Sequence, residues 1–363
     1  MEGQHAGAPW AVCLGESMAV LLPERPGPVE TVGGFRLGFG GAESNTARAL
    51  AALGVPSAWV SRVGADGFGR RLTAELAAGG VDVSGVRVDP DRPTGLYLKE
   101  VGGSGLPGDA GAGRSRLHYY RGGSAAAALS PALLDEPAAA RLLAGARLLH
   151  LTGITPALSD GCLALVRALL AERRPGRLVS FDLNWRPALW RGRDPAVLPE
   201  LLDAADLLLL GADEAEEALG TGDPAALRAM FPSPATVVVK EADRRATALD
   251  RDGAAVHESA LAVRVVEATG AGDAFAAGYL AGTLRGLDPR RRLRLGHLAA
   301  AAALTSPGDH GTLPEAPALA ALLDAPAEDW ARTTVTADGV VSPVPRPPVP
   351  APSPVPLSAP GAP

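Results

Sequence analysis

The sequence is poor in several residue types that mark particular classes of protein. Only two of its 363 residues are cysteines, Cys13 and Cys162, and each lies in an apolar run. We therefore expect two reduced core residues and no disulfide. With so few cysteines and six scattered histidines, a zinc site has no support. Aromatic residues make up 4% of the chain against 47% hydrophobic residues, so Ala, Leu and Val must build the core.

Lysine and long apolar runs are also scarce. Lys99 and Lys240 are the only lysines, and arginine supplies the rest of the 34 positive charges. The net charge of -6 and the absence of a Lys/Arg-rich run argue against a nucleic-acid binder. Because no secretory signal opens the chain and no 18-residue apolar span occurs, we expect a soluble cytoplasmic protein without a membrane partner.

Three common catalytic motifs are missing or lack their context. No GxxxxGK[ST] sequence occurs, which excludes a P-loop kinase of the usual form, and no GxSxG elbow supports a serine hydrolase. One GxGxxG match, GSGLPG at 103–108, contains Pro107 and is followed by DAGAGRSR instead of a helical pattern. This match predicts a loop and not a dinucleotide site.

Short apolar runs alternate with helix-period segments along most of the chain. This alternation predicts an α/β fold, with a mostly parallel sheet covered by helices on both faces. The runs lie at 10–17, 58–64, 147–154, 177–185, 206–211 and 236–241, and the main helical segments at 37–55, 69–80, 158–174, 195–205 and 213–231. Ligands gather at the carboxyl ends of such strands, where the chain carries Glu16, Asp182, Asn184 and Arg186.

Two stretches break the alternation. Residues 17–39 and 94–122 resemble strands without intervening helices, and we expect them to form a small β-sheet that covers the site as a lid. We place the folded domain at 10–324. Residues 325–363 end in a Pro-rich sequence without apolar periodicity, which predicts a disordered tail.

The stretch EATGAGDAFAAGYLAG, residues 267–282, places glycines directly before an aspartate at the start of a predicted helix. Gly270, Ala271 and Gly272 stand directly before Asp273 and a helical apolar run, although glycine there costs backbone entropy. Bare N–H groups at a helix start can hold a phosphate, and an adjacent carboxylate can take a proton from an attacking hydroxyl. A Gly-rich turn whose aspartate caps the helix is the structural alternative.

A second motif, together with this one, indicates a resemblance to a known family. FGGAESNTARALAALG (39–54), with GADGFG (64–69), resembles the first signature of the ribokinase-like (PfkB) carbohydrate kinases, and EATGAGD (267–273) resembles the second. The resemblance covers about residues 10–324. It implies a central sheet with a β lid, ATP and Mg²⁺, and phosphate transfer to a sugar hydroxyl. It also implies a route to a homo-oligomer, because lid sheets in this family often pair between subunits.

The resemblance assigns roles to residues on the nucleotide side. Asp273 matches the catalytic base, and Gly270, Ala271 and Gly272 match the anion hole. Thr269, Lys240 and Glu214 join Gly270 and Gly272 in cofactor binding, with Glu214 as a ligand of magnesium through water.

Within the family, the chain resembles the kinases of 2-keto-3-deoxygluconate through GGAESN (40–45), PTGLYLKE (93–100), YYRGGSA (119–125), LHLTGITPALSD (149–160) and DLNWRPALW (182–190). A sugar acid needs a paired charge, and guanidinium groups suit a carboxylate best. The substrate-binding residues that this resemblance implies are Gly40, Gly41, Asn45, Tyr97, Tyr119, Arg121 and Arg186. In the alternative reading, Arg186 is a surface charge, Tyr97 an ordinary lid residue and Arg121 a solvated rim residue.

Three departures from the family pattern lie on the nucleotide side. The usual Asn-x-x-Glu is GADE here, which keeps Glu214 but has Gly211 in place of asparagine. The usual Lys-x-Gly-x-x-Gly turn keeps Lys240 but has Ala242 and Arg245 for the glycines. Arg245 could clash with a nucleotide or contact its phosphates. The second signature opens with Glu267 and Ala268 in place of aspartate and threonine.

These observations favour one function and leave two others open. We expect ATP-dependent phosphorylation of a sugar acid, 2-keto-3-deoxygluconate, to its 6-phosphate. One alternative is a kinase for a neutral sugar such as fructose or ribose. The other is a catalytically weak protein that binds the sugar acid but has an altered nucleotide site.

Overall fold

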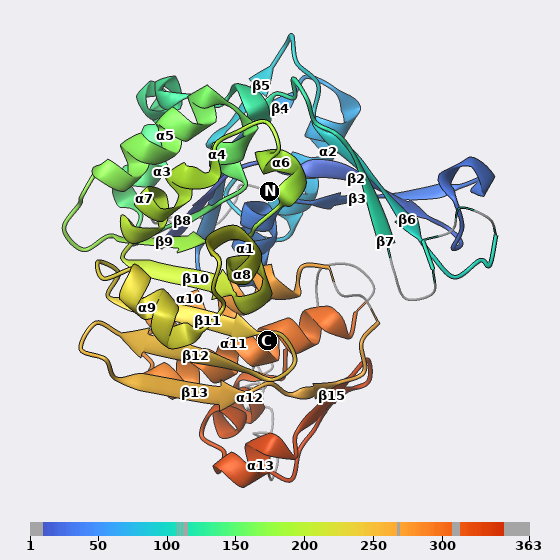
Figure 1. Cartoon of the computed structure of the whole chain (residues 1–363). Coiled ribbons are helices and arrows are strands. Elements are labelled where there is room, and N and C mark those ends of the chain that lie inside the picture. The colour runs from blue at the N-terminus through green and yellow to red at the C-terminus, as the bar shows by residue number, and fades with distance from the viewer. Residues whose placement is uncertain are drawn as a thin grey trace, which may run out of the picture.

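A large twisted sheet forms the centre of the protein (Figure 1). The computed structural model describes residues 10–106, 108, 110–111, 115–266, 269–306 and 313–344. Within these residues nine strands pair in the order β13-β12-β11-β10-β9-β8-β1-β4-β5. The strands are β1 (Ala11–Leu14), β4 (Ser57–Gly64), β5 (Val86–Asp89), β8 (Leu148–Thr152), β9 (Leu178–Asp182), β10 (Leu207–Gly211), β11 (Thr236–Glu241), β12 (Arg245–Asp250) and β13 (Ala255–Ser259). Only the pairings of β12 with β11 and β13 are antiparallel.

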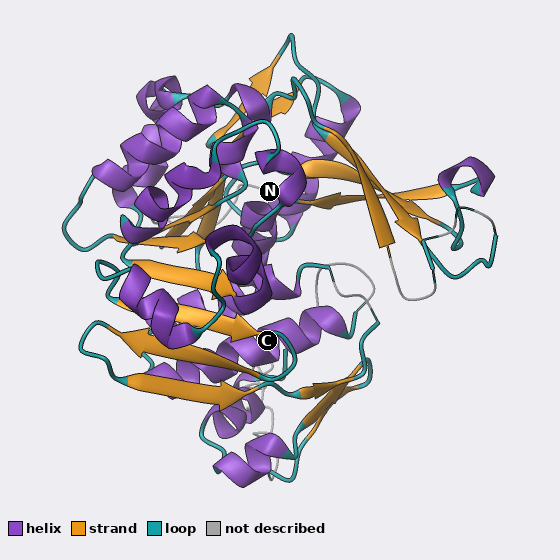
Figure 2. Cartoon of the chain, in the orientation of Figure 1, coloured by secondary structure: helices purple, strands orange, loops and turns teal. Residues whose placement is uncertain are grey.

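Helices cover both faces of this sheet (Figure 2). One face packs against α3 (Pro137–Gly145), α5 (Asp160–Ala171), α7 (Leu198–Asp203), α8 (Ala212–Leu219) and α9 (Pro224–Met230). The other packs against α1 (Ala42–Ala52), α2 (Gly67–Ala78), α10 (Ala271–Leu284) and α11 (Pro289–Leu304). Strand side chains alternate between the two cores, so Val12 and Leu14 lie in one and Ala11 and Cys13 in the other. The expected mostly parallel α/β sheet, covered on both faces, is confirmed.

Short elements complete this domain. They are α4 (Thr155–Leu158), α6 (Pro187–Trp190) and the 3-10 helices η2 (Ala126–Ala128), η3 (Pro131–Asp135) and η4 (Pro195–Val197). The single helix expected over 213–231 is two helices. Gly220 ends α8 in the left-handed conformation, with φ 81°, and Asp223 then caps α9 by accepting from the N–H of Ala226.

The expected β lid is a separate sheet in the order β3-β2-β6-β7. It contains β2 (Met18–Pro23), β3 (Phe35–Gly40), β6 (Leu96–Val101) and β7 (Ser115–Tyr120), with η1 (Val29–Thr31) between β2 and β3. Its strands reach outward from the main sheet in Figure 1. The GSGLPG sequence lies in the connection from β6 to β7 and does not precede a helix; its Pro107 is outside the described residues.

The expectation that a disordered tail begins at residue 325 is wrong for residues 325–344. These residues form α13 (Ala327–Ala331), β15 (Thr334–Thr336) and β16 (Gly339–Val341), which follow α12 (Ala316–Leu323), and β15 pairs with β14 (Ala262–Val263). Trp330 in α13 is only 1% exposed and packs against Leu298 and Leu322. The segment folds because it covers this apolar patch; residues 345–363 lie outside the described residues.

Both cysteines, Cys13 and Cys162, are free and buried. Among the described helices, none has the combination of length and apolar character that a membrane crossing requires.

Candidate active site

The start of α10 presents unpaired backbone donors. Gly270 precedes the helix with φ 81°, a left-handed conformation that glycine adopts without a steric penalty. The helical hydrogen bonds begin with the N–H of Ala274, which donates to the carbonyl of Gly270 at 2.9 Å. The N–H groups of Ala271, Gly272 and Asp273 therefore lack intrahelical acceptors, and the helix dipole favours an anion beside them.

Asp273, in the first turn of α10, is held by two amide side chains. Asn45 Nδ2 from α1 donates to Asp273 Oδ2 at 2.9 Å, and Asn184 Nδ2 donates to Asp273 Oδ1 at 3.1 Å. Asn184 follows β9 and has φ 41°, a conformation that asparagine tolerates better than most residues. Burial raises the pKa of Asp273 to about 7, although the Asn45 hydrogen bond acts in the opposite direction. A carboxylate with this pKa can accept a proton near neutral pH.

Charged side chains meet at the carboxyl ends of β9, β10 and β11. Lys240 Nζ lies 2.7 Å from Asp182 Oδ2, and Arg186 Nη1 lies 3.2 Å from Glu214 Oε1. Burial lowers the pKa of Lys240, but the carboxylates of Asp182 and Glu214 outweigh it and raise the pKa overall. Burial raises the pKa of Glu214, against the effect of Lys240. A β-carbon at Gly272 would lie 3.8 Å from Lys240 Nζ, which places the ammonium group beside the start of α10.

The GADE sequence begins α8 and shapes the surroundings of Glu214. Gly211 is the N-cap residue, and a β-carbon there would lie 2.9 Å from Glu214 Oε2. A side chain at position 211 would therefore press on this carboxylate where it now lies. No group of three His, Cys, Asp or Glu side chains that could hold a metal ion occurs in the described parts of the chain.

The turn between β11 and β12 has a left-handed residue at the position of the first missing glycine. Ala242 has φ 52°, the left-handed region that glycine favours. Arg245 Nε donates to Glu241 Oε2 at 2.5 Å, and about half of the Arg245 side chain is exposed. Arg245 thus has a partner on the neighbouring strand.

The lid brings its predicted residues together near the end of β1. Tyr97 and Tyr119 face each other across β6 and β7, with ring centroids 5.6 Å apart. The guanidinium of Arg121 lies 5.6 Å from the ring centroid of Tyr119 and forms an ion pair with Glu16. Ser124 Oγ donates to Glu16 Oε1 at 2.7 Å. Both arginines that we predicted for a substrate carboxylate are therefore paired with a carboxylate of the chain.

Comparison with known proteins decides the family. The model of the pfkB family carbohydrate kinases matches residues 10–316. The chain belongs to the pfkB family of carbohydrate kinases. It is therefore a sugar kinase with a ribokinase-like fold.

Three similar proteins illustrate the relationship. The 2-dehydro-3-deoxygluconokinase of Thermoproteus tenax is 36% identical over 307 residues, which cover 84% of this chain and 90% of that protein. The enzyme of the same name from Bacillus subtilis is 35% identical over 327 residues, covering 87% and 95%. The crystal structure of a candidate ribokinase II from E. coli, in complex with ATP and Mg²⁺, has a TM-score of 0.72 and 25% identity, covering 82% of this chain and 94% of that one.

In this pfkB-family chain, Gly40 and Gly41 join the lid to α1. Gly40 ends β3, and Gly41 is the N-cap residue of α1. A β-carbon at Gly41 would lie 2.2 Å from the carbonyl oxygen of Glu16, so only glycine allows this approach. The close contact places Asn45, one turn into α1, within reach of Asp273.

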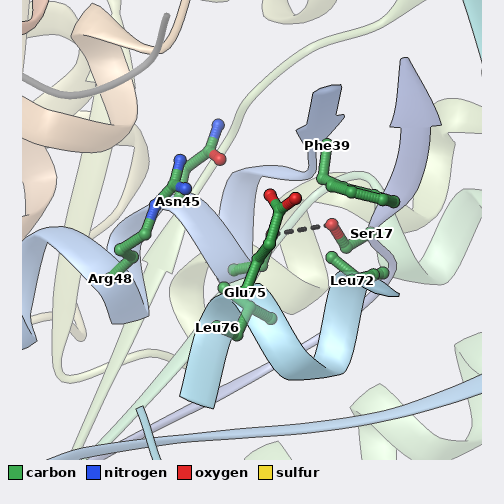
Figure 3. A pocket seen from close by; sticks show the side chains of 8 residues that line it. Ser17, Phe39, Asn45, Arg48, Leu72, Glu75 and Leu76 are labelled. Carbon is green, nitrogen blue, oxygen red and sulfur yellow. Dashed lines mark hydrogen bonds between the residues drawn. The ribbon is translucent and has the colours of Figure 1, made fainter. Parts of the chain in front are cut away.

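A pocket of this kinase lies between α1 and α2, below β3 (Figure 3). Ser17 and Ser44 are hydrogen-bonded at 2.9 Å on one side of it, and Glu75 extends into it from α2. Its lining residues are Ser17, Phe39, Ser44, Asn45, Arg48, Leu72, Glu75 and Leu76. Asn45, which donates to Asp273, forms part of the wall of this pocket.

Three polar residues at or near the site have contacts that were not predicted from the sequence. Asn184, predicted only as a polar residue at a strand end, donates to Asp273. Glu43 is fully buried and accepts from the hydroxyls of Thr152 and Thr155 at 2.7 and 2.8 Å; burial raises its pKa to about 7. Lys99 Nζ donates to Thr269 Oγ1 at 3.2 Å. Glu43 and Lys99 could have been predicted as site residues, because each is a charged residue within a motif quoted above, GGAESN and PTGLYLKE.

Proposed function

We propose that this kinase transfers the γ-phosphoryl group of ATP to the primary hydroxyl of 2-keto-3-deoxygluconate. The observation that carries the proposal is the carboxylate of Asp273, held by Asn45 and Asn184 where α10 offers its backbone donors. The two similar enzymes from Thermoproteus tenax and Bacillus subtilis support this substrate, since their name denotes the same keto acid.

The chemistry follows from this arrangement. Asp273 accepts the proton of the primary hydroxyl as its oxygen attacks the γ-phosphorus. Asn45 and Asn184 fix the orientation of the carboxylate. The N–H groups at the start of α10, with the ammonium group of Lys240, stabilise the negative charge that develops on the transferred group. Gly270, Ala271 and Gly272 form the anion hole in this proposal, and Thr269 lies at its edge.

The residues present fit a magnesium ion brought in with ATP. Mg²⁺ is usually held by one or two protein carboxylates together with substrate phosphates, so a cluster of three acidic residues is not required. Glu214 would hold it through water. Arg186 donates to Oε1 of Glu214, so the second carboxylate oxygen is the one that would accept from a water ligand of the ion. When bound, Mg²⁺ neutralises phosphate charge and orients the phosphate oxygens.

In this proposal, Arg121 and Arg186 bind the substrate carboxylate. A guanidinium group has five N–H donors, so the ion pairs with Glu16 and Glu214 leave donors for a second carboxylate. Arg121 Nε is buried without a hydrogen-bond partner, which is costly for a charged donor unless a ligand meets it. Tyr97 and Tyr119 would bond sugar oxygens, beside Gly40, Gly41 and Asn45.

The test is ADP release with ATP and Mg²⁺, comparing 2-keto-3-deoxygluconate with its galactonate-derived epimer, fructose, ribose and no sugar. We expect turnover with the keto acids only. Asp273→Asn should lower kcat by about 10²- to 10⁴-fold, because it removes the base but keeps the shape of the side chain. Its affinity for the keto acid should change little.

Two other outcomes would replace the proposal. Turnover of fructose or ribose at a higher kcat/KM would identify a neutral-sugar kinase and refute the role of the arginines. Binding of the keto acid in calorimetry without turnover of any sugar would identify a binding protein.

A further inference from the structure

The two lysines of the chain both lie beside residues 269–272, where α10 begins. Of 34 positive side chains only Lys99 and Lys240 are lysines, and both contact the segment that begins α10. Lys240, from β11, lies beside Gly272. Lys99, from β6 of the lid, donates from Nζ to Thr269 Oγ1 at 3.2 Å. A lysine ammonium is a compact point charge suited to phosphate, whereas arginine suits planar carboxylates.

Lys99 lies on the face of the lid that carries the other predicted site residues. Side chains alternate along a strand, so Tyr97 and Lys99 share one face of β6 while Leu98 and Glu100 share the other. Across the sheet, Tyr119 opposes Tyr97. Only 8% of Lys99 is exposed, and its Nζ contacts Thr269, two residues before α10.

The opposite face of the lid has a cation with a different environment. Arg116 of β7 opposes Glu100, and its Nη1 lies 3.0 Å from Glu100 Oε1. More than half of the Arg116 side chain is exposed. Arg116 therefore offers a matched control: a lid cation of similar size that does not reach α10.

We propose that Lys99 is a further catalytic residue of this kinase, whose ammonium group contacts the γ-phosphoryl group of ATP at the start of α10. The inference rests on the proposed kinase function. Lys99 donates hydrogen bonds to phosphoryl oxygens as their charge changes, and no bond to Lys99 forms or breaks. Because Lys240 belongs to the main sheet and Lys99 to the lid, the positive charge around the phosphoryl group is complete only when the lid lies against α10. Phosphate transfer is thereby coupled to closure over the sugar.

The experiment compares nucleotide affinities by calorimetry, with Mg²⁺ and saturating sugar, for the wild type, Lys99→Met and Arg116→Met. The probes are AMP-PNP, which has a γ-phosphoryl group, and ADP, which lacks it. A charge-assisted hydrogen bond corresponds to about a 10- to 100-fold change in affinity. We expect Lys99→Met to weaken AMP-PNP by about that factor and ADP by less than about threefold. Arg116→Met should change neither by more than about threefold.

Further measurements exclude a purely structural effect. Lys99→Gln keeps a hydrogen-bonding end without the charge and should behave as Lys99→Met does. Lys99→Arg keeps the charge and should retain most of the wild-type ratio of affinity for AMP-PNP to affinity for ADP. In turnover, we expect Lys99→Met to lower kcat by at least about tenfold with little change in KM for the sugar.

Three results would overturn the proposal: an unchanged affinity of Lys99→Met for AMP-PNP, an equal loss for ADP, or a loss confined to the KM of the keto acid. The last would place Lys99 at the substrate carboxylate. If the wild type phosphorylates no sugar tested, the proposed function fails. The comparison of AMP-PNP with ADP still decides whether Lys99 meets a γ-phosphoryl group.

Discussion

Asp273 is poised to titrate in the range where the enzyme would work. Burial raises its pKa to about 7, and the hydrogen bond from Asn45 limits that rise. Asp273 must be deprotonated to act as the proposed base, so activity should be lost as pH falls through its pKa. We expect kcat/KM for the sugar to rise with pH and to level off above about 7, since this ratio reports the pKa of the free enzyme.

Two variants test whether the ionisation of Asp273, and not that of a neighbouring group, produces this pH profile. Asn45→Leu removes the hydrogen bond that lowers the pKa of Asp273, so the midpoint of the profile should move to higher pH. Glu43 is a necessary control, because burial raises its pKa to about 7 as well. Glu43→Gln should leave a single ionisation in place. A profile that becomes flat in Glu43→Gln would show that Glu43, and not Asp273, controls activity.

The turn between β11 and β12 has a conformation that its sequence does not favour. Ala242 has φ 52°, and a non-glycine residue in this region costs about 1–2 kcal/mol. Ala242→Gly removes that cost but gives the unfolded chain more freedom, which offsets about 0.4–1 kcal/mol. We expect the free energy of unfolding in urea to rise by about 0.5–1 kcal/mol.

Ala246, in the adjoining strand β12, gives the matched comparison. It is fully buried, and its φ is not in the left-handed region. Ala246→Gly should lower the free energy of unfolding by about 1 kcal/mol, because glycine weakens a strand interior. A destabilised Ala242→Gly variant would mean that the methyl group of Ala242 contributes more through packing than its conformation costs.

The sequence predicted elements well wherever local signals determined them. Apolar runs marked the central strands, and the absence of helical periodicity at 17–39 and 94–122 marked the lid. The helix expected at 213–231 was divided by a turn whose signal, GTGDP, was present but outweighed by the apolar periodicity on either side. Residues 325–344 were missed because their elements are short and depend on contacts with α11 and α12.

Pairings between distant segments could not be read from the chain. Asn45 and Asp273 are 228 positions apart, and Glu16 and Arg121 are 105 apart. The motifs predicted that Asn45, Lys240 and Asp273 belong to one site, and the structure places Asn45 and Lys240 beside the start of α10. The motifs did not predict that Arg121 and Arg186 would each form an ion pair with a glutamate of the chain. That outcome depends on side-chain geometry in the folded state.

The segment 325–344 extends the main domain beyond the family match, which ends at 316. Trp330 attaches it: its Nε1 donates to the carbonyl of Ser259 at 2.9 Å, and the guanidinium of Arg294 lies 4.8 Å from its ring centroid. Arg294 is itself buried, paired with Glu258 and bonded to the carbonyl of Ala325. The segment is therefore part of the folded molecule.

Replacing Trp330 tests how much this attachment stabilises the whole protein. Trp330→Ala should lower the free energy of unfolding by about 3–5 kcal/mol, because it leaves a large cavity in a buried cluster. Val341 of β16 is 67% exposed, and Val341→Ala should change stability by no more than about 0.5 kcal/mol. Urea unfolding measures both. Equal small effects would mean that the segment rests on the domain without stabilising it.

The scarcity of lysine has a consequence for covalent labelling. In most proteins an amine-reactive reagent modifies many surface positions, but here the only side-chain amines are those of Lys99 and Lys240. Both lie at the start of α10, and both cysteines are buried. Acylation of side-chain amines would therefore be confined to two positions beside the start of α10. Attachment of this enzyme to a support or a dye through a surface lysine or cysteine calls for an engineered residue.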